Sequence, residues 1–428
     1  MNLKYLTMLC LFSLTTVMGK SQSTPTSLRI DPANARSGTV SQLFDEINYI
    51  PLETTKESLF GDIYSLVVTD KYFIIMDVST TSILLFDKKG KYHAKITNKK
   101  LTIKSLVYEK NNDRILVYLI NEKAITPEAE DKMRKNPSEL ISSIKKYVSA
   151  RYYDTDGMQL IDSVPDTAIS ISSVTASKLW QDFTASDFYL ADTRLPDSTA
   201  YQLNIYKKGK LYKSYFPYNT KKDIATCGGF GFSNGLCKSK NDSTIYFTRP
   251  FDYSIYKLTP NTINPIYKFI FPLQNTVPQS YFKDSVSTEA EFRKYLTANP
   301  GFITGLNQIH LFNGFLLFKI NNNESGFDQS NSFIYNLKSG DLISVNKSTP
   351  DKQNSYLPFL GNSFSNESFS AIDNKYLFNH VSSLEMFQAK EKTAGKNPVF
   401  SPVLENYFQT QNRKSNPVIV ELKLKENL

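Results

Sequence analysis

The residue types that most often carry chemistry are few in this chain and lie far apart. Its 428 residues include three histidines, His93, His310 and His380, and three cysteines. His310 begins one predicted strand and His380 ends another, so either imidazole could approach the mouth of a channel enclosed by such strands. The competing interpretation is a buried histidine whose hydrogen bonds hold the fold together. His93 lies in a predicted hairpin, where we expect it to face solvent.

Residues suited to ligand contact stand out more clearly than catalytic motifs. Trp180 with Asp182, and Arg249, Asp252 and Tyr253 in TRPFDYS, combine flat apolar surface with hydrogen-bonding groups. That mixture suits recognition of a sugar or a peptide. The sequence has no G-x-S-x-G elbow, no phosphate loop and no His-Glu zinc helix. We therefore assign no catalytic residue, no metal site and no cofactor.

Two cysteines, Cys227 and Cys237, flank the sequence CGGFGFSNGLC. An even pair in a secreted chain is typical of a disulfide. Spacing alone does not place the two Cα atoms within the roughly 4.4–6.8 Å that a disulfide requires. The alternative, two small buried apolar residues, therefore stays open.

The first 23 residues have the composition of a secretory signal peptide. A positive start at residues 1–4 is followed by an apolar stretch at residues 6–18 and by the small residue Ser23. Cys10 lies inside the apolar stretch, which argues against a lipid anchor. No later run has transmembrane length, and the net charge of +9 includes no basic block typical of nucleic-acid binding. We expect a secreted protein of the periplasm or outer cell surface.

One hairpin recurs along the chain and gives the strongest structural signal. It consists of an apolar strand, a turn rich in Gly, Lys or Asp, and an alternating strand. Its copies lie at residues 83–96, 150–164, 203–216, 254–270 and 333–345. A second pair of short strands recurs between the hairpins, at residues 63–77, 105–119, 236–248, 309–318 and 369–379, and is blurred within 170–192.

The sixth hairpin is divided between the two ends of the chain. Residues 418–424 supply its first strand, and the second can come only from FDEINYIPLETT at residues 44–55. We expect the region of Tyr49 to lie alongside Val420. Pro51 lacks an N–H, so this segment must be an edge strand. The sequence therefore predicts an all-β chain, a six-bladed β-propeller of four-stranded antiparallel blades closed by its N-terminal strand. We expect a single domain over residues 24–428, and a monomer.

Long insertions interrupt this pattern at positions that a propeller would place on one face. They are residues 121–148, 319–332 and 380–416 within blades, and 218–235, 272–305 and 348–367 between blades. A few short helices are expected there, after Asn136, after Thr288 with Glu291 in a capping box, and at residues 383–392. Their apolar stripes either pack on the scaffold or bind a partner. Because loops on a rigid scaffold commonly carry function, we expect the function on this face.

Several of these stretches also resemble a known family. FDEINYIPLETT, ILLFDKKGKY, residues 244–269 and NPVIVELK are similar to segments of secreted bacterial six-bladed β-propellers of TolB-like and NHL-like architecture. The resemblance implies a fold and an envelope location, but no activity. It also implies that Pro250, Phe251 and Tyr256 are packing residues, which leaves Arg249 and Asp252 for function. TNKK at residues 97–100 departs from the glycine-rich segment of many members.

Two functions fit these observations. The preferred one is a non-catalytic protein that binds a glycan, peptide or protein partner through its insertion-bearing face. The alternative is an enzyme of the lactonase or lyase type with an active site at the channel mouth and a calcium ion. Four or more oxygen ligands within roughly 2.3–2.6 Å of one point would favour the calcium enzyme. A shallow groove lined with aromatic residues would favour binding.

Overall fold

The computed structural model describes eleven segments of the chain. They are residues 24–129, 147–162, 177–180, 183–187, 199–207, 210–219, 235–239, 244–278, 289–322, 331–361 and 369–428. The predicted signal peptide, the predicted helix after Asn136, Asp182 and Cys227 lie outside these segments.

Within the described residues the strands form six sheets, five of four strands and one of five. Sheet 1 contains β3 (Ser65–Val68), β4 (Tyr72–Asp77), β5 (Ser82–Asp87) and β6 (Tyr92–Thr97); sheet 2 contains β7 (Thr102–Glu109), β8 (Arg114–Ile120), β9 (Val148–Asp154) and β10 (Gln159–Ile161); sheet 3 contains β11 (Ser177–Trp180), β12 (Phe183–Asp187), β13 (Thr199–Lys207) and β14 (Lys210–Asn219). Sheet 4 contains β15 (Leu236–Lys238), β16 (Ile245–Arg249), β17 (Asp252–Leu258), β18 (Ile263–Ile270) and β1 (Thr26–Arg29); sheet 5 contains β19 (Ile303–Phe312), β20 (Phe315–Asn322), β21 (Ser332–Asn336) and β22 (Leu342–Ser344); sheet 6 contains β23 (Ala371–Ile372), β24 (Leu377–Val381), β25 (Val418–Leu424) and β2 (Phe44–Pro51). The prediction of a mainly β chain built from four-stranded antiparallel sheets is confirmed.

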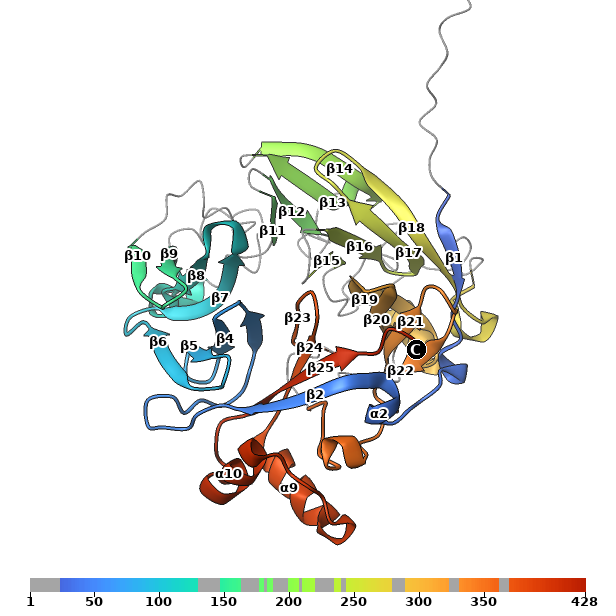
Figure 1. The fold of residues 1–428 in the computed structure, drawn as a ribbon. Helices are drawn as coiled ribbons and strands as arrows, with labels where there is room; N and C mark the ends of the chain where they lie inside the picture. Colours follow the sequence, from blue (N-terminus) through green and yellow to red (C-terminus); the bar gives the residue numbers. More distant parts are fainter. Residues whose placement is uncertain are drawn as a thin grey trace, which may run out of the picture.

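Figure 1 shows the sheets following one another around a central region in chain order. The burial of β4 explains why its sequence is apolar without alternation. Phe73 and Ile75 pack with residues of sheet 6, whereas Ile74 and Met76 pack with residues of sheet 2. A strand between two neighbouring sheets has no solvent face, so both of its sides are apolar. The core is therefore divided among the spaces between adjacent sheets.

Sheet 6 is built from both ends of the chain, as the divided hairpin predicts. β2 pairs antiparallel with β25, and Tyr49 stands opposite Val420. β2 is the outermost strand of its sheet, which leaves the missing N–H of Pro51 without a structural cost. The predicted pairing and its register are confirmed.

The N-terminal residues contact more sheets than the sequence predicts. β1 pairs parallel with β18 and adds a fifth strand to sheet 4. Arg36 and Thr39 then form bridges to Ile343 and Thr349, at the edge of sheet 5, before β2 joins sheet 6. We call residues 26–60 the N-terminal strap. It crosses three successive sheets before it reaches sheet 1.

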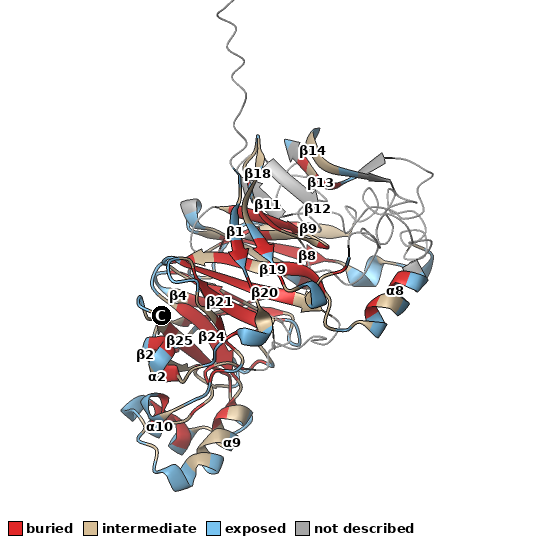
Figure 2. Cartoon of the chain, turned by 90° about the vertical axis from the view of Figure 1, so that its right-hand side faces the viewer, coloured by how far each residue is buried: buried red, intermediate tan, exposed pale blue. Residues whose placement is uncertain are grey.

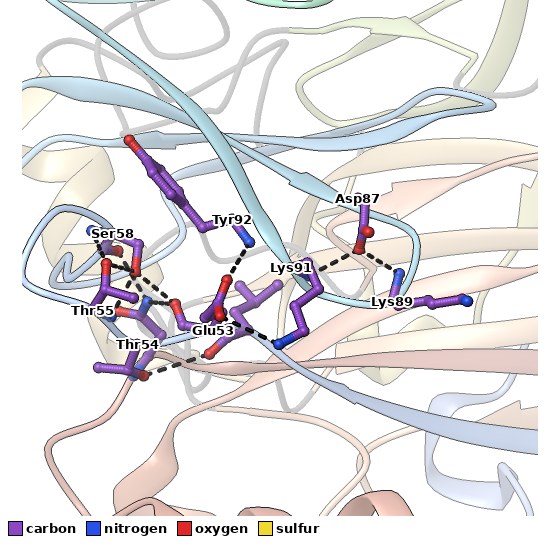
Figure 3. Close-up of polar contacts among 10 residues, drawn as sticks. Glu53, Thr54, Thr55, Ser58, Asp87, Lys89, Lys91 and Tyr92 are labelled. Atoms are coloured by element: carbon purple, nitrogen blue, oxygen red, sulfur yellow. Dashed lines mark hydrogen bonds and ion pairs between the residues drawn. The ribbon is translucent and has the colours of Figure 1, made fainter.

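The strap ends by attaching sheet 6 to sheet 1, as Figure 3 shows. Glu53 donates its backbone N–H to Gly90 O at 2.8 Å, and its carboxylate accepts from Tyr92 N at 2.9 Å. Gly90 lies in the β5–β6 turn with a φ of 81°, and Tyr92 begins β6. A side chain at Gly90 would collide with Pro51 O. Glycine is therefore required both by the turn and by the close approach of the strap.

Asn416, immediately before β25, completes this junction. Its side chain is buried, donates to Glu53 O at 2.8 Å and to Ser58 O at 2.9 Å, and accepts from Phe60 N at 3.1 Å. One amide thus satisfies three backbone groups of the strap.

The helices lie in the insertions. They include α8 (Glu289–Ala298), α9 (Ser383–Thr393) and α10 (Pro402–Thr410), with α2 (Val40–Leu43) in the strap and short helical turns η1 (Pro32–Asn34), η2 (Lys110–Asn112), η3 (Glu122–Ala124), η5 (Leu273–Asn275), η7 (Lys352–Asn354) and η8 (Ala394–Lys396). The predicted helices near Glu291 and over residues 383–392 are confirmed, and α10 was not predicted. No helix among the described residues has the length and apolar character needed to cross a membrane.

The α9–α10 pair differs in position from the sequence prediction. We expected this insertion on the common face, but Figure 1 shows both helices beside β2, at the outer edge of sheet 6. Met386, Leu404 and Tyr407 are buried in the cluster that includes Phe44 of β2. Figure 2 shows mainly exposed and intermediate residues on the remaining helix surfaces. The insertion lies at the outer edge of sheet 6 because its apolar side chains are buried against β2 there.

Deletion of residues 45–55 tests the role of β2. The shortened protein should be insoluble or melt at a far lower temperature, because β25 becomes an unpaired edge. Deletion of residues 24–30 removes only β1 and should lower the melting temperature less. An unchanged melting temperature after the first deletion would contradict a closing role for β2.

Replacement of Asn416 tests the junction itself. Asn416→Ala removes the hydrogen-bond partners of Ser58 O and Phe60 N, whereas Glu53 O still accepts from Ser58 Oγ at 2.7 Å. Each buried unpaired group costs about 1–3 kcal/mol, so we expect a loss of at least about 2 kcal/mol in the free energy of unfolding, measured by urea denaturation. The surface variant Asn264→Ala should change it by less than about 0.5 kcal/mol. Equal free energies of unfolding for the two variants would contradict a stabilising role for Asn416 at the junction.

Candidate functional site

Polar side chains gather at one end of the sheets. We call this end the entry face, because the innermost strands β3, β7, β15, β19 and β23 begin there. The next strand of each sheet runs antiparallel, so β4, β8, β16, β20 and β24 end there. Asp77 ends β4 and Arg249 ends β16. His380 lies next to the end of β24.

Arg249 and Asp252 are brought together, as predicted, within a network that joins sheets 3 and 4. The Arg249 guanidinium donates to Asp252 Oδ2 at 3.1 Å and to Gln202 Oε1 of β13 at 2.6 Å, and lies 4.2 Å from the centre of the Phe216 ring. Tyr256 O–H also donates to Asp252, at 2.7 Å. These contacts hold two neighbouring sheets together.

Tyr253 is directed into the protein. Its O–H donates to Ile303 O at 2.9 Å, and its ring packs edge-on against Phe271. Burial raises the pKa of Tyr253 to about 12. The described contacts of Tyr253 therefore connect sheet 4 to the start of β19.

His310 and Trp180 lie at other places in the fold. We expected His310 at the start of its strand, but β19 begins at Ile303, so His310 lies near the opposite end, away from the entry face. Trp180 pairs with Phe183 where β11 turns into β12. Asp182 and the side chain of Trp180 are outside the described part of the chain. Among the described candidates, His310 therefore lies apart from Arg249 and His380.

Cys237 is a buried residue of β15, opposite Tyr246. Because Cys227 lies outside the described segments, the predicted disulfide between them stays a prediction.

His380 lies where sheet 6 meets sheet 1, a boundary that we call the seam. Its imidazole is 3% exposed. Nδ1 lies 3.0 Å from Ser370 Oγ, just before β23, and Nε2 lies 3.4 Å from Asp62 Oδ1, just before β3. The latter contact is an ion pair when the imidazole is protonated. The predicted position of His380 near the entry face is consistent with these contacts.

Asp77 organises the loops on the sheet 1 side of the seam. Its carboxylate is buried and accepts hydrogen bonds from the backbone of Gly61, Asp62, Ser79 and Thr80, and from the hydroxyls of Ser79 and Thr80. Burial alone would raise the pKa of Asp77, but the hydrogen bonds outweigh it and hold the pKa below the usual 3.8. One carboxylate therefore fixes both the loop before β3, through Gly61 and Asp62, and the loop after β4, through Ser79 and Thr80.

Large side chains are exposed on these fixed loops. Leu59 is 47% exposed, Tyr64 53% and Val78 49%. Tyr64 comes directly before β3, where its backbone N–H donates to Met76 O at 3.0 Å. We call Asp62, Tyr64, Val78 and His380, with Leu59 at the margin, the seam site. An exposed aromatic ring and exposed aliphatic groups on loops that also carry a carboxylate are suited to ligand contact.

Among the described residues, no group of three or more His, Cys, Asp and Glu side chains has the arrangement of a metal site. In the seam site the Asp62 carboxylate lies against the His380 imidazole, whose other nitrogen contacts the hydroxyl of Ser370. The site can bind a ligand, and its imidazole can transfer a proton.

The fold and site define a large β protein with polar groups at the junction of its first and last sheets. The chain belongs to the family described as Domain of unknown function (DUF4934), which matches residues 27–423. The match includes residues 27–60 of the strap, Asn416 and the seam site.

A solved structure with a TM-score above 0.5 shares the fold at low sequence identity. A putative exported protein from Bacteroides fragilis is 15% identical, with a TM-score of 0.58 over 94% of this chain and 100% of that one. A member of the DUF4221 family from Bacteroides vulgatus is 10% identical, with a TM-score of 0.39 over 90% and 98% of the two chains. No curated protein matches the chain in sequence.

Asp77→Asn tests whether the buried carboxylate fixes the seam loops. The amide nitrogen cannot accept hydrogen bonds, so we expect a loss of about 2–3 kcal/mol at pH 7. Because the pKa of Asp77 is lowered on folding, its stabilising effect is lost as the pH falls through the folded-state pKa. Denaturant titrations should show the difference from wild type closing below about pH 4. Asp70→Asn, on an exposed turn, is the control; a similar effect in both variants would contradict this role.

Proposed function

We propose that the protein is an exported six-bladed β-propeller, a single domain over residues 24–428 with each sheet as one blade. The order of the sheets, the pairing of β2 with β25 and the strap support closure of the ring. The fold shared with a putative exported protein supports export, as does the signal-peptide pattern at residues 1–23. The periplasm or the outer cell surface is the proposed location.

The propeller acts as a non-catalytic binding protein for a glycan, peptide or protein partner. One observation carries this proposal: the 53%-exposed side chain of Tyr64 stands on loops that the buried Asp77 holds in place. A rigid loop loses little conformational entropy when a ligand binds, so more of the contact energy appears as affinity. Arg249 and Asp252 remain secondary candidates on the entry face.

A catalytic role is the second candidate. The His380 imidazole contacts the Ser370 hydroxyl through one nitrogen and the Asp62 carboxylate through the other. A carboxylate beside an imidazole that contacts a hydroxyl is the arrangement that activates a nucleophile. Turnover of an ester or lactone that is abolished by Ser370→Ala, while ligand affinity is retained, would favour the enzyme.

Tyr64→Ala tests the binding function. The purified mature protein is screened against glycan and peptide arrays, and the strongest ligand is titrated into each variant. Loss of the aromatic ring should weaken binding at least tenfold, a change of about 1.4 kcal/mol. Tyr201→Ala removes another exposed tyrosine, on β13, and should bind like wild type. Wild-type affinity in Tyr64→Ala would refute a binding role for the seam site.

A further inference from the structure

Two polar side chains of β9, Ser149 and Arg151, enter the apolar boundary between sheets 1 and 2. Directly opposite residues on antiparallel strands share one face of the sheet. Ser149 stands opposite Leu119 of β8, and Arg151 stands opposite Val117. Both of these partners are buried in the hydrophobic cluster that joins the two sheets. Ser149 and Arg151 therefore lie on the side of sheet 2 that packs against sheet 1.

Neither side chain has a partner within the described part of the chain. Arg151 Nε and Ser149 Oγ are both buried without a hydrogen bond, and no ion pair of Arg151 occurs among the described residues. Tyr153, the next residue on the same face, does have a partner, because its O–H donates to Gln159 Oε1 at 3.2 Å. The missing hydrogen bonds are therefore specific to positions 149 and 151.

An unpaired guanidinium at this boundary is costly. A charge that leaves water without a counter-charge loses hydration that nothing in the protein replaces. Arg114, on the neighbouring strand β8, avoids this cost through an ion pair with Glu109 at 2.8 Å. Arg151 keeps its charge without such a pair, which is explained when a ligand supplies the negative group. The residue as a whole is half-buried, so a small solute can reach its outer atoms.

The two donors together suit an oxoanion. A guanidinium matches the paired oxygens of a carboxylate or a phosphate, and such charge-assisted hydrogen bonds are stronger than neutral ones. Residues two apart on a strand have Cα atoms about 6.5 Å from each other. The long side chain of Arg151 and the hydroxyl of Ser149 can therefore donate to oxygens of one anion. A neutral sugar would leave the charge of Arg151 uncompensated.

The connection from β6 to β7 adds positive charge beside this boundary. Lys99 and Lys100 are exposed on it, and Leu101, which follows them, packs on the cluster that joins sheets 1 and 2. Asn98 Oδ1 accepts from the backbone N–H groups of Lys100 and Leu101, which fixes the turn. Exposed positive charges attract anions over a distance of about 8 Å at physiological salt.

We propose that Arg151 and Ser149 form a binding site for a small oxoanion, a carboxylate or a phosphate, between sheets 1 and 2. The Arg151 guanidinium pairs with the anion, and the Ser149 hydroxyl donates to another of its oxygens. The seam site lies between sheets 6 and 1. The oxoanion site is therefore a second site, and it does not depend on the proposed binding function.

Isothermal titration calorimetry of the mature protein tests the site. Inorganic phosphate and acetate are titrated separately, with sodium chloride holding the ionic strength constant. Wild type should bind at least one of them, Arg151→Met at least about tenfold more weakly, and Ser149→Ala about threefold more weakly. Arg413→Met removes an exposed arginine that already pairs with Glu391 and should bind as wild type. Tighter binding of phosphate identifies a phosphate site, and tighter binding of acetate identifies a carboxylate site.

Melting temperatures separate anion binding from folding. Methionine keeps an apolar stem and removes the unpaired charge, so Arg151→Met should melt no lower than wild type in chloride alone. The anion that binds should raise the melting temperature of wild type but not of Arg151→Met. Tyr64→Ala should keep this response, because the seam site is separate.

Three results would each overturn the inference. They are the absence of phosphate and acetate binding to wild type, equal anion binding by wild type and Arg151→Met, and a lower melting temperature of Arg151→Met in chloride alone. The last result would mean that the arginine has a structural partner. None of the three bears on ligand binding at Tyr64, so the proposed function would stand or fall on its own test.

Discussion

The architecture depends on one pairing, that of β2 with β25. The last sheet takes its outer strand from residues 44–51, which precede every strand of the other sheets except β1. Asn416 converts this pairing into a junction, because its single buried amide binds three backbone groups of the strap as the strap passes to sheet 1. Sheet 6 is thereby held against sheet 1, and the seam between them exists only because both ends of the chain meet.

The seam site follows from that junction. Asp62 and His380 lie in the first and last sheets and come within 3.4 Å only when the two sheets adjoin. Asp77 provides the rigidity, since it fixes the loops that carry Asp62 and Val78 through neutral donors. The same choice of donors leaves the local negative charge in place. The pairing of β2 with β25 therefore brings the two sides of the site together, whereas Asp77 holds its loops in place.

The sequence was sufficient to predict the structural features that repeat along the chain. Turn chemistry and strand period identified most sheets, and Pro51 with the incomplete final hairpin predicted the register of Tyr49 against Val420. It was insufficient for β1, because the four residues TSLR carry no distinctive pattern and their parallel partner is distant. The start of β19 was also missed, since a register shift near Gln308, which has a φ of 52°, interrupts its alternation. The seam site could not be predicted, because Asp62, Asp77 and His380 share no motif and meet through topology alone.

The strap also determines the order in which the molecule can be completed. Its residues are made well before β18, β22 and β25, against or near which the strap lies. Contacts of such wide sequence separation form slowly, because a long loop must close before they contribute. Until those strands are made the strap lacks its partners, and Pro51 limits the strand pairings that β2 can accept. The pairing of β2 with β25 can therefore form only after residues 418–424 are available.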